Sequence, residues 1–319
     1  MMNIGIAGSG MIVPDFLEAA AKVNDFNIVA ICGRTQSKTK LENIALTHGI
    51  LNIYYEYEKM LENNDINVIY VAMPNNFHYE YAKKALLAGK NVILEKPFAS
   101  TYTQAEELVS IAKQNKLYLF EAITNQYLPN YKKVKDILHE LGPIRIVQMN
   151  FSQYSSRYDK FKQGEIAPVF NKEMGGGALG DLNIYNIYFI VGLWGSPLSV
   201  KYYPNIQDEI DTSGILIMEY PDFKCTAIGA KDCRASASIS IQGEDGYISS
   251  DDTPNSFNRF SVILKDRPLE EFELNNNMPR LYYELLEFKN MVEQREYEKN
   301  IKQMDLSLKI MKILDEAKK

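Results

Sequence analysis

Apolar and polar positions follow two alternating kinds of pattern over the first 122 residues. Short apolar runs predict buried strands, and the stretches between them have the spacing of amphipathic helices. The runs read NIGIA, NIVAICG, INVIYVAMP, NVILE and LYLFEA, and helices are predicted near residues 12–22, 79–88 and 103–114. Regular strand–helix alternation is typical of a parallel, doubly wound sheet. We therefore predict an α/β domain of the Rossmann type over residues 1–122.

The pattern changes near residue 123. After one more predicted helix at residues 130–140, apolar and polar residues alternate in RIVQMNFSQ, SGILIMEY, KCTAIGAK, SASISIQG and FSVILKD. This alternation predicts an open, largely antiparallel sheet with one solvated face. Two helical patterns, at residues 281–294 and 305–317, follow the last of these runs. We expect residues 123–319 to form a second domain of the α+β class.

Glycines and a helix start follow the first predicted strand. Gly8, Ser9 and Gly10 lie between strand and helix, and Met11 and Ile12 open the helix. A dinucleotide pyrophosphate binds at such a place, because glycine lets the backbone approach and the helix N-terminus favours an anion. We predict that these five residues bind a dinucleotide. The alternative is a tight structural turn, and the third fingerprint position holds valine in place of a small residue.

The end of the second strand decides between NAD and NADP. An acidic residue there would bind the ribose 2′-hydroxyl of NAD, but the chain has Gly33, Arg34 and Thr35, followed by Lys38. Arginine and hydroxyl groups suit a 2′-phosphate, so the sequence favours NADP, with NAD as the alternative. The competing interpretation is that Arg34 and Lys38 are solvated surface charges.

Two later loops are expected at the same edge of the sheet, because ligands of open α/β sheets bind outside the carboxyl ends of the strands. The first, PNNFH, contains Pro74, Asn75 and His78; the second, EKP, contains Glu95 and Lys96. The Lys96 ammonium would donate to a substrate oxygen near the nicotinamide, unless it forms an ion pair with Glu95 or another carboxylate. His78 either reaches the cofactor or caps the helix that follows.

A glycine-rich stretch in the second domain, GGGALGDLNIYNIYF, spans residues 175–189. Asp181 and Tyr185 are four residues apart there, so on an α-helix they would face the same side. A carboxylate and a phenol could take part in proton transfer. The alternatives are structural roles: a helix N-terminal carboxylate for Asp181 and a core aromatic residue for Tyr185.

Composition limits the classes of partner. The 319 residues are 46% hydrophobic and carry a net charge of −6, with no basic run, which argues against nucleic acid and favours a small molecule. The three cysteines form no CxxC pair, so neither a disulfide framework nor a metal site is predicted, and a cytoplasmic location fits best.

Neither the N-terminus nor the long apolar stretch predicts an export signal or a membrane span. No export signal is visible at the N-terminus. Residues 182–200 carry no charge, but asparagine, glycine and proline interrupt them, so we predict a buried helix and a turn in place of a membrane span.

Three of these stretches together resemble the Gfo/Idh/MocA oxidoreductases, named for glucose-fructose oxidoreductase and inositol dehydrogenase. They are GIAGSG, PNNFHYEYAKKALLAGKNVILEKPFA and GGGALGDLNIY. The resemblance implies that the first domain binds NAD(P), that the second binds substrate and joins subunits, and that Lys96 is catalytic. It also implies a cis peptide bond between Lys96 and Pro97.

Within that family the chain resembles the branch with tyrosine where many members have histidine. This implies that Tyr185 is the acid/base, with Lys96 as the cation that stabilises its phenolate, while Asp181 orients the substrate or Lys96. The chain departs from the family at Asn125 and Gln126, where relatives often have an aromatic–arginine pair.

These expectations combine into one hypothesis with two alternatives. We predict an oxidoreductase that prefers NADP and acts on a sugar, diol or related polyhydroxylated carbonyl or alcohol. Apolar side chains on the outer face of the second sheet predict a homodimer or homotetramer. The alternatives are an NADP-sensing regulator without catalysis and an NAD-dependent glycosidase with no net redox change.

Overall fold

The computed structural model describes all 319 residues, which divide into two compact units. The first contains Met1–Ala122 and Met278–Met311, and the second contains Ile123–Asn277 and Lys312–Lys319. The division after residue 122 coincides with the predicted domain boundary. The structure departs from the predicted continuous second domain, because residues 278–311 belong to the first unit. An amphipathic helix pattern shows that a helix packs on something, but not on which sheet.

The first unit contains a six-stranded parallel sheet with the strand order β3-β2-β1-β4-β5-β6. This is the order of a dinucleotide-binding doubly wound sheet, so the predicted fold class is confirmed. Residues of β4 and β5 are buried almost throughout, as expected for strands covered on both faces. The strands are β1 (Met2–Ala7), β2 (Phe26–Cys32), β3 (Asn52–Tyr54), β4 (Val68–Val71), β5 (Asn91–Glu95) and β6 (Leu119–Ala122).

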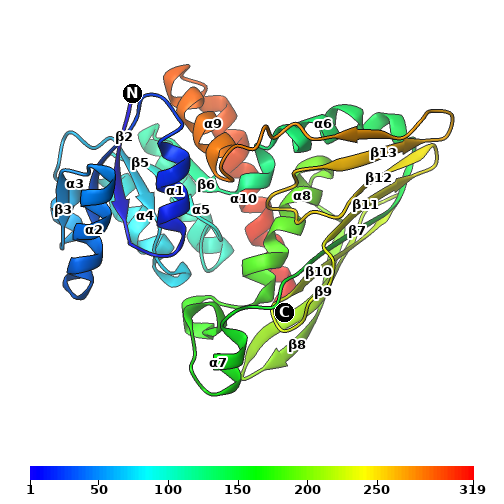
Figure 1. The fold of residues 1–319 in the computed structure, drawn as a ribbon, viewed down its shortest axis with the longest axis horizontal. Helices are drawn as coiled ribbons and strands as arrows, with labels where there is room; N and C mark the ends of the chain where they lie inside the picture. The colour runs from blue at the N-terminus through cyan, green and yellow to red at the C-terminus, as the bar shows by residue number, and fades with distance from the viewer. The chain divides into compact units, whose positions relative to one another are not determined.

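Helices lie on both faces of this sheet (Figure 1). On one side α1 packs against α9, and elsewhere α4 packs against α5. In the core the ring of Phe16 stacks on that of Tyr70, with centroids 3.8 Å apart. The helices are α1 (Ile12–Ala20), α2 (Lys38–His48), α3 (Tyr57–Leu61), α4 (His78–Leu87), α5 (Tyr102–Asn115), α9 (Tyr282–Glu293) and α10 (Tyr297–Ala317), with short 3-10 turns η1 (Thr35–Ser37) and η2 (Asn75–Phe77).

Helix α10 closes the open edge of this sheet at β6. The side chain of Asn300 is fully buried. Its amide oxygen accepts from the backbone N–H of Leu119 at 3.1 Å, and its amide nitrogen donates to the Leu119 carbonyl at 3.0 Å. At Leu119 one side chain thus replaces the hydrogen bonds of a neighbouring strand, and this contact attaches the start of α10 to the first unit.

The second unit contains an eight-stranded sheet in the order β14-β13-β12-β11-β7-β10-β9-β8. The pair β7–β10 is parallel and the other neighbours are antiparallel, which confirms a largely antiparallel sheet. The prediction missed β8, β12 and β14, whose apolar alternation is weak. The strands are β7 (Ile144–Ser152), β8 (Ser199–Gln207), β9 (Ile210–Glu219), β10 (Lys224–Ala230), β11 (Ser238–Gly243), β12 (Gly246–Ser250), β13 (Phe260–Leu264) and β14 (Glu270–Phe272).

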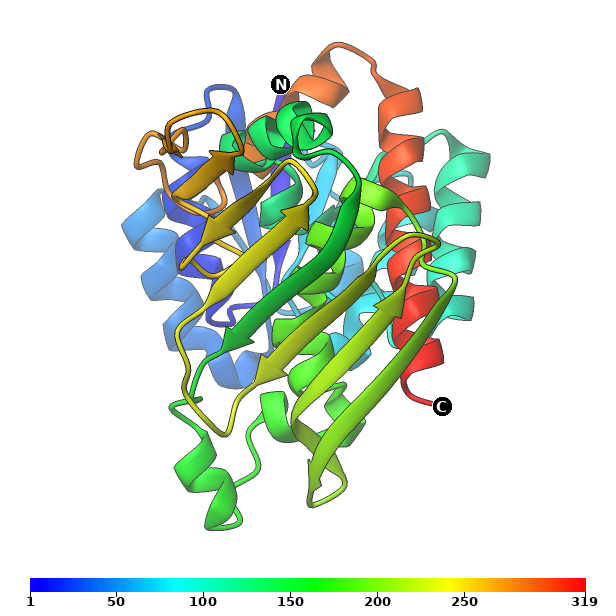
Figure 2. The ribbon, with the colours of Figure 1, turned by 90° about the vertical axis from the view of Figure 1, so that its right-hand side faces the viewer.

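Figure 2 shows the sheet of the second unit face on, with α8 behind it and no helix over β8, β9 or β10 on the side of the viewer. None of the helices in the structure has both the length and the apolar character needed to cross a membrane. The helical elements of this unit are η3 (Thr124–Gln126), α6 (Pro129–Ile137), η4 (Leu138–Leu141), α7 (Tyr158–Lys162), η5 (Pro168–Phe170), η6 (Lys172–Met174), η7 (Leu179–Asn183) and α8 (Ile184–Trp194).

The edge contact of α10 gives a stability prediction. Asn300→Ala should lower the free energy of unfolding by about 2–4 kcal/mol, because it leaves a buried N–H and a buried carbonyl without partners. Urea unfolding followed by circular dichroism measures this loss. Asn115→Ala is the control, because the Asn115 side chain makes a single exposed bond to Ile111 O. Equal effects of the two changes would contradict the proposed role of Asn300.

Candidate functional site

The glycine loop after β1 has no room for a side chain at its first glycine. Gly8 has φ +115°, and a Cβ atom there would overlap the carbonyl oxygen of Ala72. Only glycine therefore fits, and the loop lies where the strand order reverses between β1 and β4. Helix α1 begins at Ile12, so its N-terminus follows the loop directly.

The loop after β2 presents cations to solvent. Arg34 and Thr35 are exposed, and Lys38 forms an exposed ion pair of 3.8 Å with Glu42. Sequence reasoning missed a second lysine, Lys40, whose ammonium donates to the backbone carbonyl of Ser9 in the glycine loop. Lys40 lies in the first turn of α2, so its ammonium joins the start of α2 to the glycine loop after β1.

His78 joins the two later loops of the first unit. Its ring is fully buried, with Nδ1 2.8 Å from the carbonyl oxygen of Pro97 and Nε2 2.9 Å from that of Met73. Burial lowers the pKa of His78 below its usual value. Both ring nitrogens are therefore directed at backbone, and the ring does not cap α4. This geometry favours neither contact with the cofactor nor capping of α4. His78 instead binds the loop that contains Lys96, through the carbonyl of Pro97.

The other residues predicted for these two loops lie at the ends of β4 and β5. Pro74 is exposed and Asn75 half-buried at the start of η2. The Lys96–Pro97 bond is cis, as predicted. These positions all follow the carboxyl ends of β4 and β5.

Glu95 is turned into the first unit. Its carboxylate accepts a hydrogen bond of 2.6 Å from the hydroxyl of Tyr70, and burial raises the pKa of Glu95 while the charge of Lys96 opposes that rise. Sequence reasoning missed a second buried carboxyl, Glu284 of α9, whose two oxygens have no hydrogen-bond partner. Burial, with the charge of Glu95, raises the pKa of Glu284 well above its usual value. The residue before Lys96 is thus held by a buried tyrosine.

Asp181 lies in a π-helical turn, η7, and Tyr185 in the first turn of α8. The prediction of one regular α-helix here is corrected, because a π turn holds an extra residue and shifts the side chains that follow it. The Asp181 carboxylate is 31% exposed and pairs with the ammonium of Lys231 at 2.6 Å. Such π turns occur often at functional sites.

A different carboxylate serves the helix N-terminus. Asp211 of β9 accepts from the backbone N–H of Leu179 at 2.7 Å and from the hydroxyl of Tyr202 at 2.8 Å. Gly177 has φ +115°, and a Cβ atom there would overlap the Asp211 carboxylate. Burial raises the pKa of Asp211 and these hydrogen bonds oppose the rise. Asp211 is therefore the carboxylate that binds the helix N-terminus, the role considered as the alternative for Asp181.

Tyr185 is mostly buried in the second unit. Tyr185 is 6% exposed, and its ring centroid lies 6.1 Å from that of Phe151. The amide of Asn125 donates to the Tyr185 carbonyl at 2.7 Å, and the amide of Gln126 donates to the Tyr188 carbonyl at 2.9 Å. The two residues that replace the family's aromatic–arginine pair therefore hold α8 in place.

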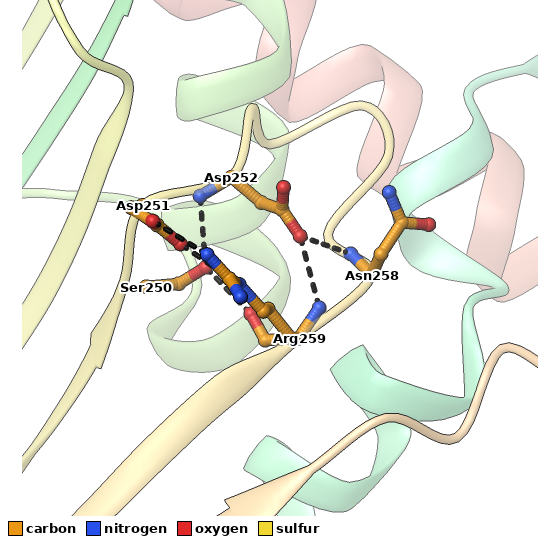
Figure 3. Close-up of polar contacts among 5 residues, drawn as sticks. All are labelled: Ser250, Asp251, Asp252, Asn258 and Arg259. Carbon is orange, nitrogen blue, oxygen red and sulfur yellow. Dashed lines mark hydrogen bonds and ion pairs between the residues drawn. The ribbon is translucent and has the colours of Figure 1, made fainter.

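The turn that contains Asn125 is itself supported by the loop between β12 and β13. Figure 3 shows Asp252 accepting from the backbone N–H groups of Asn258 and Arg259, at 2.8 and 2.9 Å. The ordered loop presents the Asn255 carbonyl to the hydroxyl of Thr124, which lies at 2.9 Å. Neighbouring backbone carbonyls of the loop bind the amide of Asn130 in α6.

Comparison with known proteins gives the family. Residues 2–122 match the oxidoreductase family with an NAD-binding Rossmann fold, and residues 131–249 match the GFO/IDH/MocA C-terminal domain. The NADP(+)-dependent scyllo-inositol 2-dehydrogenase of Bacillus subtilis is 33% identical over 100% of this chain and 97% of its own length. The trans-1,2-dihydrobenzene-1,2-diol dehydrogenase of Xenopus tropicalis is 30% identical over 68% of this chain and 64% of its own length.

The chain belongs to the Gfo/Idh/MocA family of NAD-binding oxidoreductases, as the sequence resemblance implied. Its fold also matches a solved 3-ketoreductase from Actinomadura kijaniata in complex with NADP and TDP-benzene. The two have a TM-score of 0.84 and 22% identity, over 99% of this chain and 97% of the other.

The loop after β2 gives a prediction on cofactor preference. The protein should bind NADP(H) at least about tenfold more tightly than NAD(H), about 1.4 kcal/mol, and Arg34→Ala should remove most of this gap because a 2′-phosphate loses its guanidinium. Fluorescence titration with NADPH and NADH measures both affinities. Lys59→Ala is the control, since Lys59 pairs with Glu62 on the exposed surface of the same unit. Equal affinity of the unchanged protein for the two cofactors would contradict the assignment.

Proposed function

We propose that this protein is an NADP(H)-dependent oxidoreductase that converts an uncharged sugar, diol or other polyol to the corresponding carbonyl compound, or the reverse. The main support for the proposal is that the start of the helix formed by η7 and α8 is held in place by side chains of the second unit. Asp181 and Tyr185 are held on that helix by Asn125 and Lys231, as preorganised catalytic groups require.

The cofactor is proposed to bind the loops of the first unit. Its pyrophosphate would lie on Gly8, Ser9, Gly10 and the start of α1, which the steric requirement at Gly8 supports. Its 2′-phosphate would be bound by the loop after β2, where Arg34, Thr35, Lys38 and the additional Lys40 supply cations and a hydroxyl, and Pro74, Asn75 and the Glu95–Lys96 loop would flank the nicotinamide half. NADP(H) supplies or accepts the hydride when it is bound.

Tyr185 is proposed as the acid/base that moves the substrate's hydroxyl proton. A phenol with an ordinary pKa near 10 does this at neutral pH only when a cation stabilises its phenolate, and Lys96 is proposed as that cation. Asp181, with Lys231 against it, is proposed to bind a substrate hydroxyl and not to carry the proton. The name and activity of the inositol dehydrogenase relative support a polyol as substrate.

The charges of the second unit support an uncharged substrate. Lys231 is paired with Asp181, and the amides of Asn125 and Gln126 are bound to backbone carbonyls. A phosphorylated or carboxylated sugar would need an unpaired cation, whereas Lys231 is already neutralised by Asp181. We propose a cytoplasmic location, which the three unbridged cysteines support.

A second copy of the chain is proposed to cover the outer face of the second sheet, giving a homodimer or a homotetramer. Cross-strand neighbours on this face include Tyr203, Ile215 and Ile228, and the first two are 49% and 43% exposed. Ile146 and Tyr247, also exposed, extend the apolar surface over β7 and β12. Apolar side chains in one row of an uncovered sheet are typical of a subunit interface.

The proposed acid/base gives the main kinetic prediction. Tyr185→Phe keeps the ring and its packing but removes the hydroxyl, so folding and NADPH binding should survive while kcat falls by ~10²–10⁴. Lys96→Met should be comparably damaging, and the two losses should not add because both residues serve one proton transfer. Lys96→Met should also move the limb of the pH–rate profile that reports the tyrosine to higher pH.

The assay follows NADPH absorbance with scyllo-inositol, myo-inositol, D-xylose and D-glucose as substrates. Tyr188→Phe is the control, because Tyr188 is a buried tyrosine of the same helix. It should keep kcat within about threefold, the scatter expected when only local stability changes. Near-normal turnover by a well-folded Tyr185→Phe variant would remove Tyr185 from the mechanism.

The outer sheet face gives a prediction on assembly. Ile215→Lys should weaken self-association at micromolar concentration, because it places a charge in the apolar row next to Tyr203. Multi-angle light scattering measures the mass. Leu46→Lys is the control, since Leu46 is 86% exposed on α2 of the other unit and should leave the mass unchanged. A monomeric parent protein would contradict the proposal.

A further inference from the structure

Lys231 follows β10 and is an unusual lysine for this chain, because its side chain is only 3% exposed. Burying an ammonium costs several kcal/mol unless it is paired and hydrogen-bonded. The other buried lysine, Lys90, bonds the backbone carbonyls of Asn63 and Ile66, and burial lowers the pKa of Lys90. Lys231 differs from Lys90 because its partner is a carboxylate of the candidate site.

Both the backbone and the ammonium group of Lys231 are held by hydrogen bonds. Its backbone N–H donates to Thr212 O at 2.8 Å, and its carbonyl accepts from Ser155 N at 2.8 Å. Its ammonium donates to Asp181 Oδ2 at 2.6 Å and to Val169 O at 3.0 Å, and it lies 4.9 Å from the centroid of the Phe170 ring. A side chain with these neighbours has little rotational freedom, so it holds the Asp181 carboxylate in one direction.

The neighbouring carboxylates have other tasks. Asp211 binds the helix N-terminus at Leu179; burial raises its pKa, while its hydrogen bonds and, less strongly, the charge of Lys231 oppose the rise. Asp232, next in the chain, accepts from the hydroxyls of Thr212 and Ser213 at 2.7 and 2.9 Å. Asp181 is therefore the carboxylate that combines a direct bond to the buried cation with a side chain one-third exposed.

We propose that Lys231 is a positioning residue, which holds Asp181 as an ionised carboxylate aimed at a substrate hydroxyl. The inference rests on the proposed function and adds a residue from outside the family's sequence motifs. Lys231 does not contact the reacting atoms. It acts through Asp181, so its loss should weaken the binding of a polyol and leave the chemical step nearly intact.

The test compares Lys231→Gln, which removes the charge but keeps an N–H donor for Val169 O, with Asp181→Asn and the double variant. The affinity of the protein–NADP⁺ complex for scyllo-inositol and D-xylose is measured by calorimetry, and kcat by NADPH absorbance. Each single change should weaken polyol binding roughly 10- to 100-fold, the range for a hydrogen bond to a charged group. The double variant should bind no worse than the weaker single variant, because both residues form one unit.

Two measurements separate this role from a structural one. NADPH affinity should stay unchanged in every variant, and kcat of Lys231→Gln should fall far less than the ~10²–10⁴ expected for a missing acid/base. Lys172→Gln is the control, since Lys172 pairs with Glu209 through exposed side chains of the same unit and should leave polyol affinity unchanged. If Lys231→Gln does not fold, Asp181→Asn, which keeps an oxygen for Lys231, supplies the comparison.

The outcomes distinguish this inference from the proposed function. A parent protein that binds the polyols without hydride transfer would remove the proposed function and leave the binding comparison valid. Lower melting temperature with unchanged polyol affinity in Lys231→Gln, or additive losses in the double variant, would overturn the positioning role. A parent–NADP⁺ complex that binds neither polyol would overturn it as well, because Asp181 would then have no hydroxyl to accept from.

Discussion

The attachment of one helix to one strand fixes the helix that contains Asp181 and Tyr185, the proposed site residues of the second unit. The buried amides of Asn183 and Asn186 donate to the carbonyls of Ala227 and Ile228 in β10, both at 2.9 Å. A Cβ atom at Gly229 would lie 2.7 Å from that of Asn183, so the helix lies directly on the strand. Such buried amide bonds have narrow geometric tolerance, and they fix the rotation of the helix about its axis.

This attachment also explains the π-helical turn. The amide of Asn186 reaches the side-chain oxygen of Asn183 at 2.8 Å, and the turn η7 ends at Asn183. The extra residue of a π turn lets the glycine segment meet Asp211 while the rest of the helix stays on β10. Lys231 follows the same strand, so its contact with Asp181 depends on the same attachment.

Much of the fold could be predicted from local patterns. The strand–helix alternation gave the parallel sheet, and Gly8 and Lys96 were found because each directly follows a buried strand. The π turn could not be predicted, since it depends on the fit between Asn183 and β10 and not on periodicity. Lys231 and Asp211 were missed for a related reason, because each is far in sequence from the helix start that it contacts, at Asp181 and at Leu179. Asn300 has no sequence signal beyond a polar residue in an amphipathic helix.

The most direct test of the account is the fate of a carbon-bound hydrogen of the substrate. Fully C-deuterated scyllo-inositol or D-xylose is incubated with the protein and NADP⁺, and the cofactor is analysed by NMR and mass spectrometry. Hydride transfer from the polyol would give NADPH with one deuterium at C4 of the nicotinamide and a carbonyl product that has lost one deuterium. NADP⁺ that remains unreduced and unlabelled, while the protein binds it and the polyol, would contradict the claim that this chain is a polyol oxidoreductase.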